Sequence, residues 1–374
     1  MLKYRRAAIE IESPEQLGYD TILYNLSESS VTDARMQDLD LSLEDVVLQY
    51  GDHFGKPELR KLITDGQGVG SDDILLTVGA AGALFIIATS LLKACDRVVV
   101  AFPNYSTNIE TPRAIGCEVD FLPLTFENKF QVDVDQLAEK ITPQTKLISL
   151  TNPHNPTGSV MSADTLRSIV KLVEASGAYL LIDETYREMN FGDLPPLAAS
   201  LSPRVISVSS LSKTYGLPGI RLGWLITQDK ALMETFLAAK EQIYITNSII
   251  DEEIAYRYLL HRDAYVEVIK QHIAANFEVV KAWMANQDEM EWIEPQGGVV
   301  CFPRIKHRVD VDLDKFYDVL TSRYKTYVGP GHWFEFDRRY MRIGYGWPAH
   351  DVLQQGLENI TRSIREAQKI RFGE

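Results

Sequence analysis

The middle of the chain alternates short apolar runs with helical patterns, and this alternation constrains the fold more than any other feature. The apolar runs lie at Ile74–Val78, Arg97–Ala101, Glu118–Leu122, Leu147–Thr151, Tyr179–Asp183, Val205–Ser209 and Leu222–Thr227. Helical patterns lie between them, at Ala80–Lys93, Asp133–Ile141, Ser162–Ser176 and Asp229–Gln242. Most of the runs are continuously apolar, as strands covered on both faces are. The pattern predicts an α/β fold with a mostly parallel, seven-stranded sheet between helices.

The pattern changes on either side of this region. A long helical stretch, Asp251–Gln287, leads into a β-rich segment, Gly298–Pro303. It is followed by an expected helix, strand and terminal helix at Leu313–Arg323, Met341–Tyr345 and Asp351–Lys369. We therefore expect an N-terminal arm at 1–40 that packs on a small domain, a large domain at 41–275, and the small α/β domain itself at 276–374.

Composition narrows the class of partner. The net charge of -14 argues against nucleic acid or an anionic membrane surface as the main partner. No secretory signal and no apolar run of membrane-spanning length are visible, which favours a cytoplasmic protein. Cys95, Cys117 and Cys301 are odd in number and widely spaced, so we expect buried or partly buried thiols and no metal site.

The most informative segment spans residues 210–223 and reads Ser-Leu-Ser-Lys-Thr-Tyr-Gly-Leu-Pro-Gly-Ile-Arg-Leu-Gly. Its Lys213 follows an apolar run, and Arg221 comes eight residues later. An amine in this setting can form an imine with an aldehyde, while Ser210, Ser212 and the guanidinium can hold a phosphate. A lysine between serines is often a solvated loop residue, so the order of the whole segment carries the argument.

Two further polar segments directly follow expected strands. Residues 152–158 read Asn-Pro-His-Asn-Pro-Thr-Gly, which taken alone would be an ordinary turn. Asp183 is the first polar residue after the run that starts at Tyr179. Taken alone, an acid at this position is weak evidence for a site, because acids are also common where helices begin.

A run of small residues, Thr77–Ala83, joins an expected strand to an expected helix. Free N–H groups at a helix N-terminus make a natural phosphate seat, so Gly79, Ala80 and Ala81 are candidate ligands. Close packing of helix against strand explains the same residues equally well.

In this order the segments resemble the class I/II aminotransferases, which are fold-type I pyridoxal 5'-phosphate (PLP) enzymes. The resemblance runs from about Leu26 to Gly344. It implies that Lys213 carries the cofactor as a Schiff base and shuttles the proton, and that Arg221 and Ser210 bind its phosphate. It also implies that Asp183 faces the ring nitrogen, and that Asn155 and Tyr186 bond the phenolic oxygen.

The resemblance extends to four more positions. Tyr105 matches an aromatic that stacks on the pyridine ring, and Ala81 stands where the family often has a hydroxyl residue. Tyr50 matches a tyrosine that reaches the phosphate in the neighbouring subunit, which implies a homodimer with shared active sites. Arg342 matches the arginine that clamps the substrate α-carboxylate, a task that suits a bidentate fork, although alone it is simply a strand arginine.

The resemblance implies an aminotransferase that moves an amino group between an L-amino acid and a 2-oxo acid. The same residues would serve a PLP-dependent lyase or a cyclising synthase. A non-catalytic regulator of this fold would carry a DNA-binding module, for which no basic region precedes Leu26. Specificity is expected to lie in Ser27–Ser30, Asp52, His53 and Tyr327–Phe334. No assured second arginine for a dicarboxylate is present, which disfavours aspartate as donor.

Overall fold

The structure is a computed structural model, and it describes residues 2–39 and 41–368. Its centre is a seven-stranded sheet with the strand order β2-β8-β7-β6-β5-β3-β4. The strands are β2 (Ile74–Val78), β3 (Arg97–Phe102), β4 (Glu118–Pro123), β5 (Thr145–Thr151), β6 (Tyr179–Asp183), β7 (Val205–Ser210) and β8 (Leu222–Ile226). The predicted α/β architecture and all seven expected strands are confirmed, with ends that differ by a residue or two.

One strand runs against the others. β8 pairs antiparallel with both β7 and β2, and every other pair in this sheet is parallel. Two reversals restore the direction, so β2 runs the same way as β7. The carboxyl ends of β2, β3, β5, β6 and β7 therefore meet at one edge, which is where open α/β sheets bind ligands.

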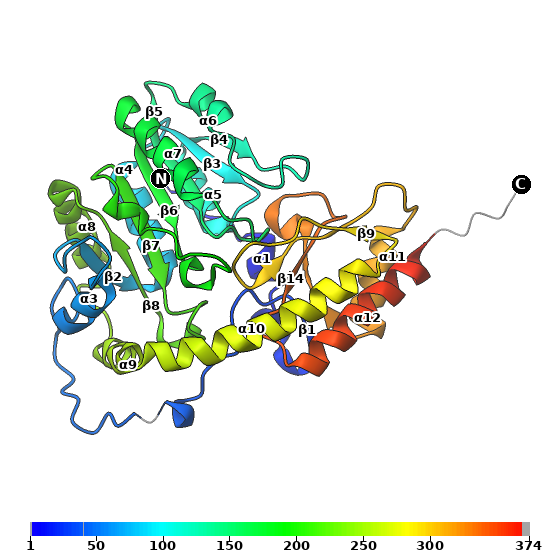
Figure 1. Ribbon diagram of the computed structural model, residues 1–374. Helices are drawn as coiled ribbons and strands as arrows, with labels where there is room; N and C mark the ends of the chain where they lie inside the picture. The colour runs from blue at the N-terminus through cyan, green and yellow to red at the C-terminus, as the bar shows by residue number, and fades with distance from the viewer. Residues whose placement is uncertain (1, 40, 369–374) are drawn as a thin grey trace, which may run out of the picture.

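Helices cover both faces of the sheet (Figure 1). They are α4 (Gly79–Leu91), α5 (Ser106–Ile115), α6 (Val134–Lys140), α7 (Ala163–Ser176) and α8 (Lys230–Ile243). Val98 packs in one core cluster with Ile87 of α4 and Phe236 of α8, while its neighbour Val99 packs in another with Ile169 of α7. Successive strand residues thus enter opposite cores, which explains why the strands read as continuous apolar runs.

A second α/β unit follows. Its helices α10 (Arg262–Ala285) and α12 (His350–Ala367) pack together, and Figure 1 shows them side by side, away from the large sheet. Its short strands are β9 (Met290–Glu291), β10 (Val300–Cys301), β11 (Arg304–Ile305), β12 (Thr326–Tyr327), β13 (Gly329–Pro330) and β14 (Met341–Gly344). β14 lies between β10 and β13, and this position brings Arg342 towards the large sheet.

The N-terminal segment contacts both units. β1 (Tyr24–Asn25) pairs with β12, and Leu26 is buried in the core of the second unit. Earlier in the chain, α1 (Ala8–Ile11) packs its Ala8 and Ile9 against a core cluster of the large sheet, and α2 (Pro14–Leu17) follows. The first residues therefore lie on the large unit as well, while the boundaries at residues 40 and 275 stay predictions.

The expected helix Asp251–Gln287 is wrong as a single element. It is two helices, α9 (Ile249–Leu260) and α10, separated by the non-helical His261. α9 buries Ile254 in the core of the large sheet, whereas α10 buries Ile273 in the core of the second unit. The chain turns between two cores at this point. The spacing of apolar residues does not reveal the turn, because it is helical on both sides of it.

The structure also differs from the expectations in smaller details. The expected helix Leu313–Arg323 is α11 (Leu313–Asp318) followed by a π-helical turn (Val319–Arg323). α5 was not anticipated, because it carries Pro112 in its interior. Cys95 is exposed rather than buried. The expected C-terminal helix ends at Ala367, and Lys369 lies outside the described residues.

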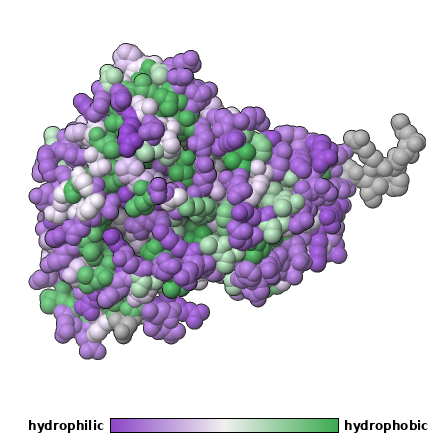
Figure 2. Space-filling view, in the orientation of Figure 1, coloured by the Kyte–Doolittle hydropathy of each residue, from purple (hydrophilic) through white to green (hydrophobic). Residues whose placement is uncertain are grey.

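The visible surface is mostly hydrophilic, with hydrophobic residues in small groups (Figure 2). Within residues 2–39 and 41–368, no helix is both long and apolar enough to cross a membrane.

Candidate active site

A pocket of about 370 Å³ opens at the carboxyl edge of the large sheet. The predicted site residues that line it are Ala80, Ala81, Tyr105, Asn155, Asp183, Tyr186, Ser210, Ser212, Lys213, Arg221 and Arg342. They come from segments more than 250 residues apart in sequence, and the shared strand direction brings most of them to one edge. The pocket is also lined by Ser27, Glu28 and Ser29 from the N-terminal segment.

Lys213 lies in the loop that reverses the chain between β7 and β8. Among the described residues, no carboxylate lies within salt-bridge distance of its amine, and no hydrogen bond to the amine is formed. Burial lowers the pKa of Lys213, and the negative charge of Glu28 partly opposes this effect. A lowered pKa increases the share of neutral amine, which is the nucleophilic form.

Asp183 ends β6 and is buried. Its Oδ1 accepts hydrogen bonds from the Thr185 hydroxyl at 2.6 Å and from the Thr185 backbone N–H at 3.1 Å. Its Oδ2 receives no hydrogen bond from any described residue. Burial raises the pKa of this carboxyl, and no cation among the described residues compensates its charge. The free oxygen and the missing cation suit a protonated ring nitrogen.

Arg221 lies beside the start of α4. Its Nη1 donates to the Ser212 hydroxyl at 3.2 Å and to the Pro218 carbonyl at 2.8 Å. A Cβ added at Gly79 would lie 2.5 Å from Arg221 Nη2, so only glycine lets the guanidinium approach the helix so closely. Gly79 thus allows Arg221 to lie close to the start of α4, although Gly79 itself does not line the pocket. A guanidinium, two serine hydroxyls and free helix N–H groups form a seat for a phosphate. Ala81 contributes no hydroxyl to this seat.

Arg342 reaches the pocket from β14 and is almost fully buried. Its Nη1 donates to Asn155 Oδ1 at 3.2 Å and its Nη2 to the Ser27 carbonyl at 2.7 Å. Its Nε has no hydrogen-bond partner, and no carboxylate pairs with the guanidinium among the described residues. Because Asn155 uses its oxygen for Arg342, its amide N–H groups remain free to donate.

Tyr186 and Tyr105 also border the pocket. The Tyr186 hydroxyl donates to the Ser29 carbonyl at 2.6 Å, and burial raises its pKa to about 12. Its proton is therefore committed to Ser29, and donating to a cofactor oxygen instead requires this bond to break. Burial raises the pKa of Tyr105 as well, which keeps that phenol neutral.

The pocket fits PLP on three independent observations. A carboxylate with an unused oxygen, a cluster of phosphate donors and a lysine amine without a partner all line the same pocket. Each is a group whose burial is unfavourable until a complementary charge or bond arrives. The cofactor carries the matching groups, namely a pyridine nitrogen, a phosphate and an aldehyde.

Three predicted residues lie elsewhere. Tyr50 is 80% exposed and lies outside the pocket, as a residue that acts in a neighbouring subunit would. Asp52 and His53 also lie outside it, and His53 pairs with Glu241. By contrast Trp333, from the expected specificity segment, lines the pocket.

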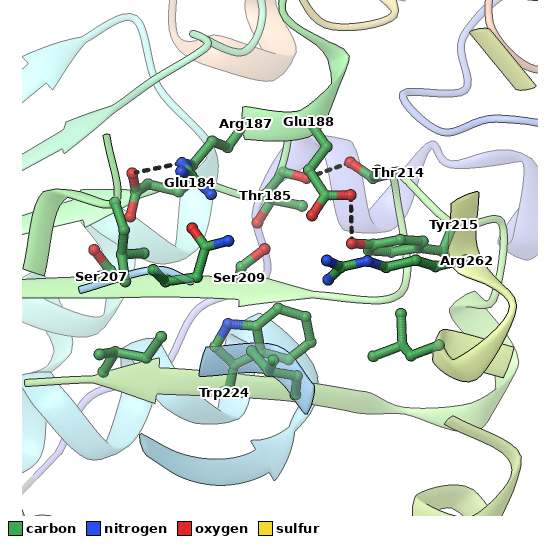
Figure 3. A pocket seen from close by; sticks show the side chains of 15 residues that line it. Glu184, Thr185, Arg187, Glu188, Ser207, Ser209, Thr214, Tyr215, Trp224 and Arg262 are labelled. Carbon is green, nitrogen blue, oxygen red and sulfur yellow. Dashed lines mark hydrogen bonds and ion pairs between the residues drawn. The ribbon is translucent and has the colours of Figure 1, made fainter. Parts of the chain in front are cut away.

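A second cavity, of about 50 Å³, shares Thr185 with the first and is also lined by Thr214 and Tyr215 (Figure 3). Here the Thr214 hydroxyl donates to the Thr185 carbonyl at 2.7 Å, and the Tyr215 hydroxyl to Glu188 at 2.5 Å. Both bonds tie the loop that carries Lys213 to the loop that follows Asp183. These two hydrogen bonds therefore help to fix the positions of the two loops relative to each other.

Thr185 is a site residue that sequence reasoning missed. The available signal was a hydroxyl residue two positions after a candidate aspartate, a spacing at which side chains bond locally. We expect Thr185→Val to lower kcat/KM by about 10-fold, because a hydrogen bond to a charged group is lost while the side-chain shape is kept. Thr185→Ser keeps the hydroxyl and should therefore retain most of the wild-type kcat/KM. Equal losses in both variants, measured with equal thermal stability, would contradict this role.

Comparisons with known proteins agree with this geometry. The family model "Aminotransferase class I and II" matches residues 18–360. A capreomycidine synthase from Streptomyces vinaceus is 31% identical over 329 residues, which cover 86% of this chain and 82% of that protein. The arginine–pyruvate transaminase AruH from Pseudomonas aeruginosa is 28% identical over 294 residues, 76% of this chain and 74% of that protein.

A solved structure is similar along nearly the whole chain. The PLP-dependent cyclase OrfR superposes with a TM-score of 0.88 at 28% identity, covering 97% of this chain and 98% of that one. The family match covers most of the chain and agrees with a pocket whose free groups fit PLP. The chain belongs to the class I and II aminotransferase family of fold-type I, PLP-dependent proteins.

Proposed function

We propose that the protein is an aminotransferase that moves an amino group from an L-amino acid to a 2-oxo acid. The observation that carries this proposal is the shared pocket of Lys213, Asp183 and Arg342, each with an unused charge or bond. Together they supply a nucleophilic amine, a partner for a ring cation and an arginine for a carboxylate.

Bound PLP supplies an aldehyde that reacts with amines and a pyridine ring that accepts the electron pair left by proton removal. Asp183, whose Oδ1 is held by Thr185, would keep the ring nitrogen protonated. Arg221, Ser210, Ser212 and the start of α4 hold the phosphate.

Arg342 orients the substrate by its α-carboxylate, and its unpartnered Nε is satisfied by that contact. Lys213 Nζ, which lines the same pocket, would be the base that takes the substrate α-proton and the acid that gives it back. Because burial lowers the pKa of Lys213, a larger share of this amine is neutral and able to act as a base than for an exposed lysine.

We also propose a homodimer with shared sites. Val47, Leu48 and Tyr50 are 66%, 76% and 80% exposed, which is unusual for three large apolar or aromatic side chains so close in sequence. A second copy that covers this segment would bury them and carry Tyr50 to the partner's phosphate seat.

A cyclising synthase or a lyase is the second candidate. The names of two similar proteins favour it, because one is a synthase and the other a cyclase. Both reactions begin with the same proton removal, so Lys213, Asp183 and Arg342 would keep their tasks.

Incubating the holoenzyme with an amino donor, in the absence of any 2-oxo acid acceptor, distinguishes the candidates. We expect the holoenzyme to release about one equivalent of 2-oxo acid per site and then stop, with the cofactor converted to its amine form. Adding a 2-oxo acid should restart turnover. Continuous release of ammonia without an acceptor would indicate a lyase, and continuous consumption without oxo acid or ammonia a cyclase. Absorbance and product analysis read all three outcomes.

A further inference from the structure

The segment Ser27–Ser29 lines the candidate active site and is held there by hydrogen bonds from two other lining residues. Arg342 donates to the Ser27 carbonyl at 2.7 Å, and Tyr186 to the Ser29 carbonyl at 2.6 Å. Between them, the Glu28 carbonyl packs so closely on β14 that a Cβ added at Gly344 would lie 1.8 Å from it. The backbone of Glu28 is therefore fixed on three sides, and its side chain lines the pocket.

The Glu28 carboxylate has only neutral partners. Its Oε1 accepts from the Tyr19 hydroxyl at 3.2 Å and from Asn25 Nδ2 at 3.4 Å. Its Oε2 receives no hydrogen bond from any described residue. Burial raises the pKa of Glu28, and the positive charges of Lys213 and Arg342 oppose that rise without forming salt bridges to it.

A second observation, independent of this acid, indicates which ligand charge Arg342 lacks. The Arg342 guanidinium is almost fully buried, its Nε is unpartnered and its other nitrogens bond neutral oxygens. Beside the groups that suit the cofactor, the pocket thus contains Arg342 and Glu28, a cation and an anion that form no salt bridge with any described residue. A ligand that satisfies both carries a carboxylate at one end and a cation at the other.

We propose that Glu28 binds the side-chain cation, an ammonium or a guanidinium, of a basic amino-acid substrate. The inference rests on the proposed function, in which Arg342 holds the α-carboxylate and leaves the substrate side chain to point elsewhere. Glu15 lines the same pocket and adds negative charge on the path from solvent. An acidic side chain would meet repulsion from both carboxylates, and a neutral one would leave Glu28 unpaired.

The test compares pairs of amino donors that differ in charge. L-ornithine and L-arginine are each measured against L-norvaline, which lacks the side-chain cation, as donors to the holoenzyme. We expect the wild type to favour the cationic donors, and Glu28→Gln to lower the ornithine-to-norvaline ratio of kcat/KM by about 10- to 100-fold. Glu234→Gln, an exposed position on α8, is the control and should keep the wild-type ratio.

Binding is measured separately with α-methyl-L-ornithine, which has the cation but lacks the α-proton. Its dissociation constant, from absorbance titration of the holoenzyme, should rise by a similar factor in Glu28→Gln. A wild type without preference for cationic donors, or a variant with unchanged ratio and affinity, would overturn the inference. If no amino acid reacts at all, the proposed function fails, while the titration still decides whether Glu28 binds the cation.

Discussion

Replacing Lys213 by alanine is expected to abolish covalent capture of the cofactor and to lower turnover by at least about 10³-fold. General acid–base catalysis by a positioned side chain contributes about 10²- to 10⁴-fold, and the variant loses the covalent link as well. The phosphate seat around Arg221 is untouched, so the variant should still bind the cofactor without a covalent bond. Borohydride reduction followed by intact-mass measurement separates the two effects.

The matched control is Lys171→Ala, at an exposed position on α7. After reduction, the wild type and the control should gain the mass of the cofactor, and Lys213→Ala should not. A stable cofactor adduct on Lys213→Ala, or normal turnover by it, would contradict the assignment of this amine.

Asp183→Asn is expected to lower turnover by about 10²- to 10³-fold, the range seen when one preorganised electrostatic contact is removed. Asparagine keeps the shape, and its oxygen can still accept from Thr185. At the position of Oδ2 it presents an N–H donor in place of a negative oxygen, so it no longer favours a protonated ring nitrogen. The change should appear in turnover and in the absorbance spectrum of the bound cofactor.

Glu184→Gln provides the control for this prediction. Glu184 is the next residue, is also buried, and lines the second cavity rather than the cofactor pocket (Figure 3). Burial raises the pKa of Glu184 to about 7, so part of its carboxyl is protonated and uncharged at neutral pH. Glutamine resembles this uncharged form in shape. We expect activity within about threefold of wild type. Similar losses at both positions would contradict a specific role of Asp183, because they would show that any buried carboxylate in this region matters, whichever pocket it lines.

The strands were predictable because burial on both faces leaves a mark in the sequence. Val98 and Val99 enter opposite cores, so both must be apolar, and the run is continuous. The order of strands across the sheet and the reversed direction of β8 leave no such mark. They depend on which strand edges pair in the tertiary structure.

The helix break at His261 is a second feature that the sequence pattern does not reveal. The apolar positions of α9 and α10 read as one periodic pattern, although Ile254 and Ile273 are buried in different cores. The spacing of apolar residues indicates that one face of a helix is buried, but it does not indicate which core covers that face.

The sequence alone was enough to predict the residues of the candidate pocket, because Lys213, Asp183, Asn155 and Arg221 each lie at the end of a strand, or after a strand or a glycine-rich turn, and these local patterns can be recognised in the sequence. Tertiary structure decided which charges remain unpaired. Arg342 and Glu28 lie more than 300 positions apart, and only the packing of the arm against β14 brings both to one pocket. Local patterns depend on neighbours along the chain, whereas an unpaired buried charge depends on every group that surrounds it in space.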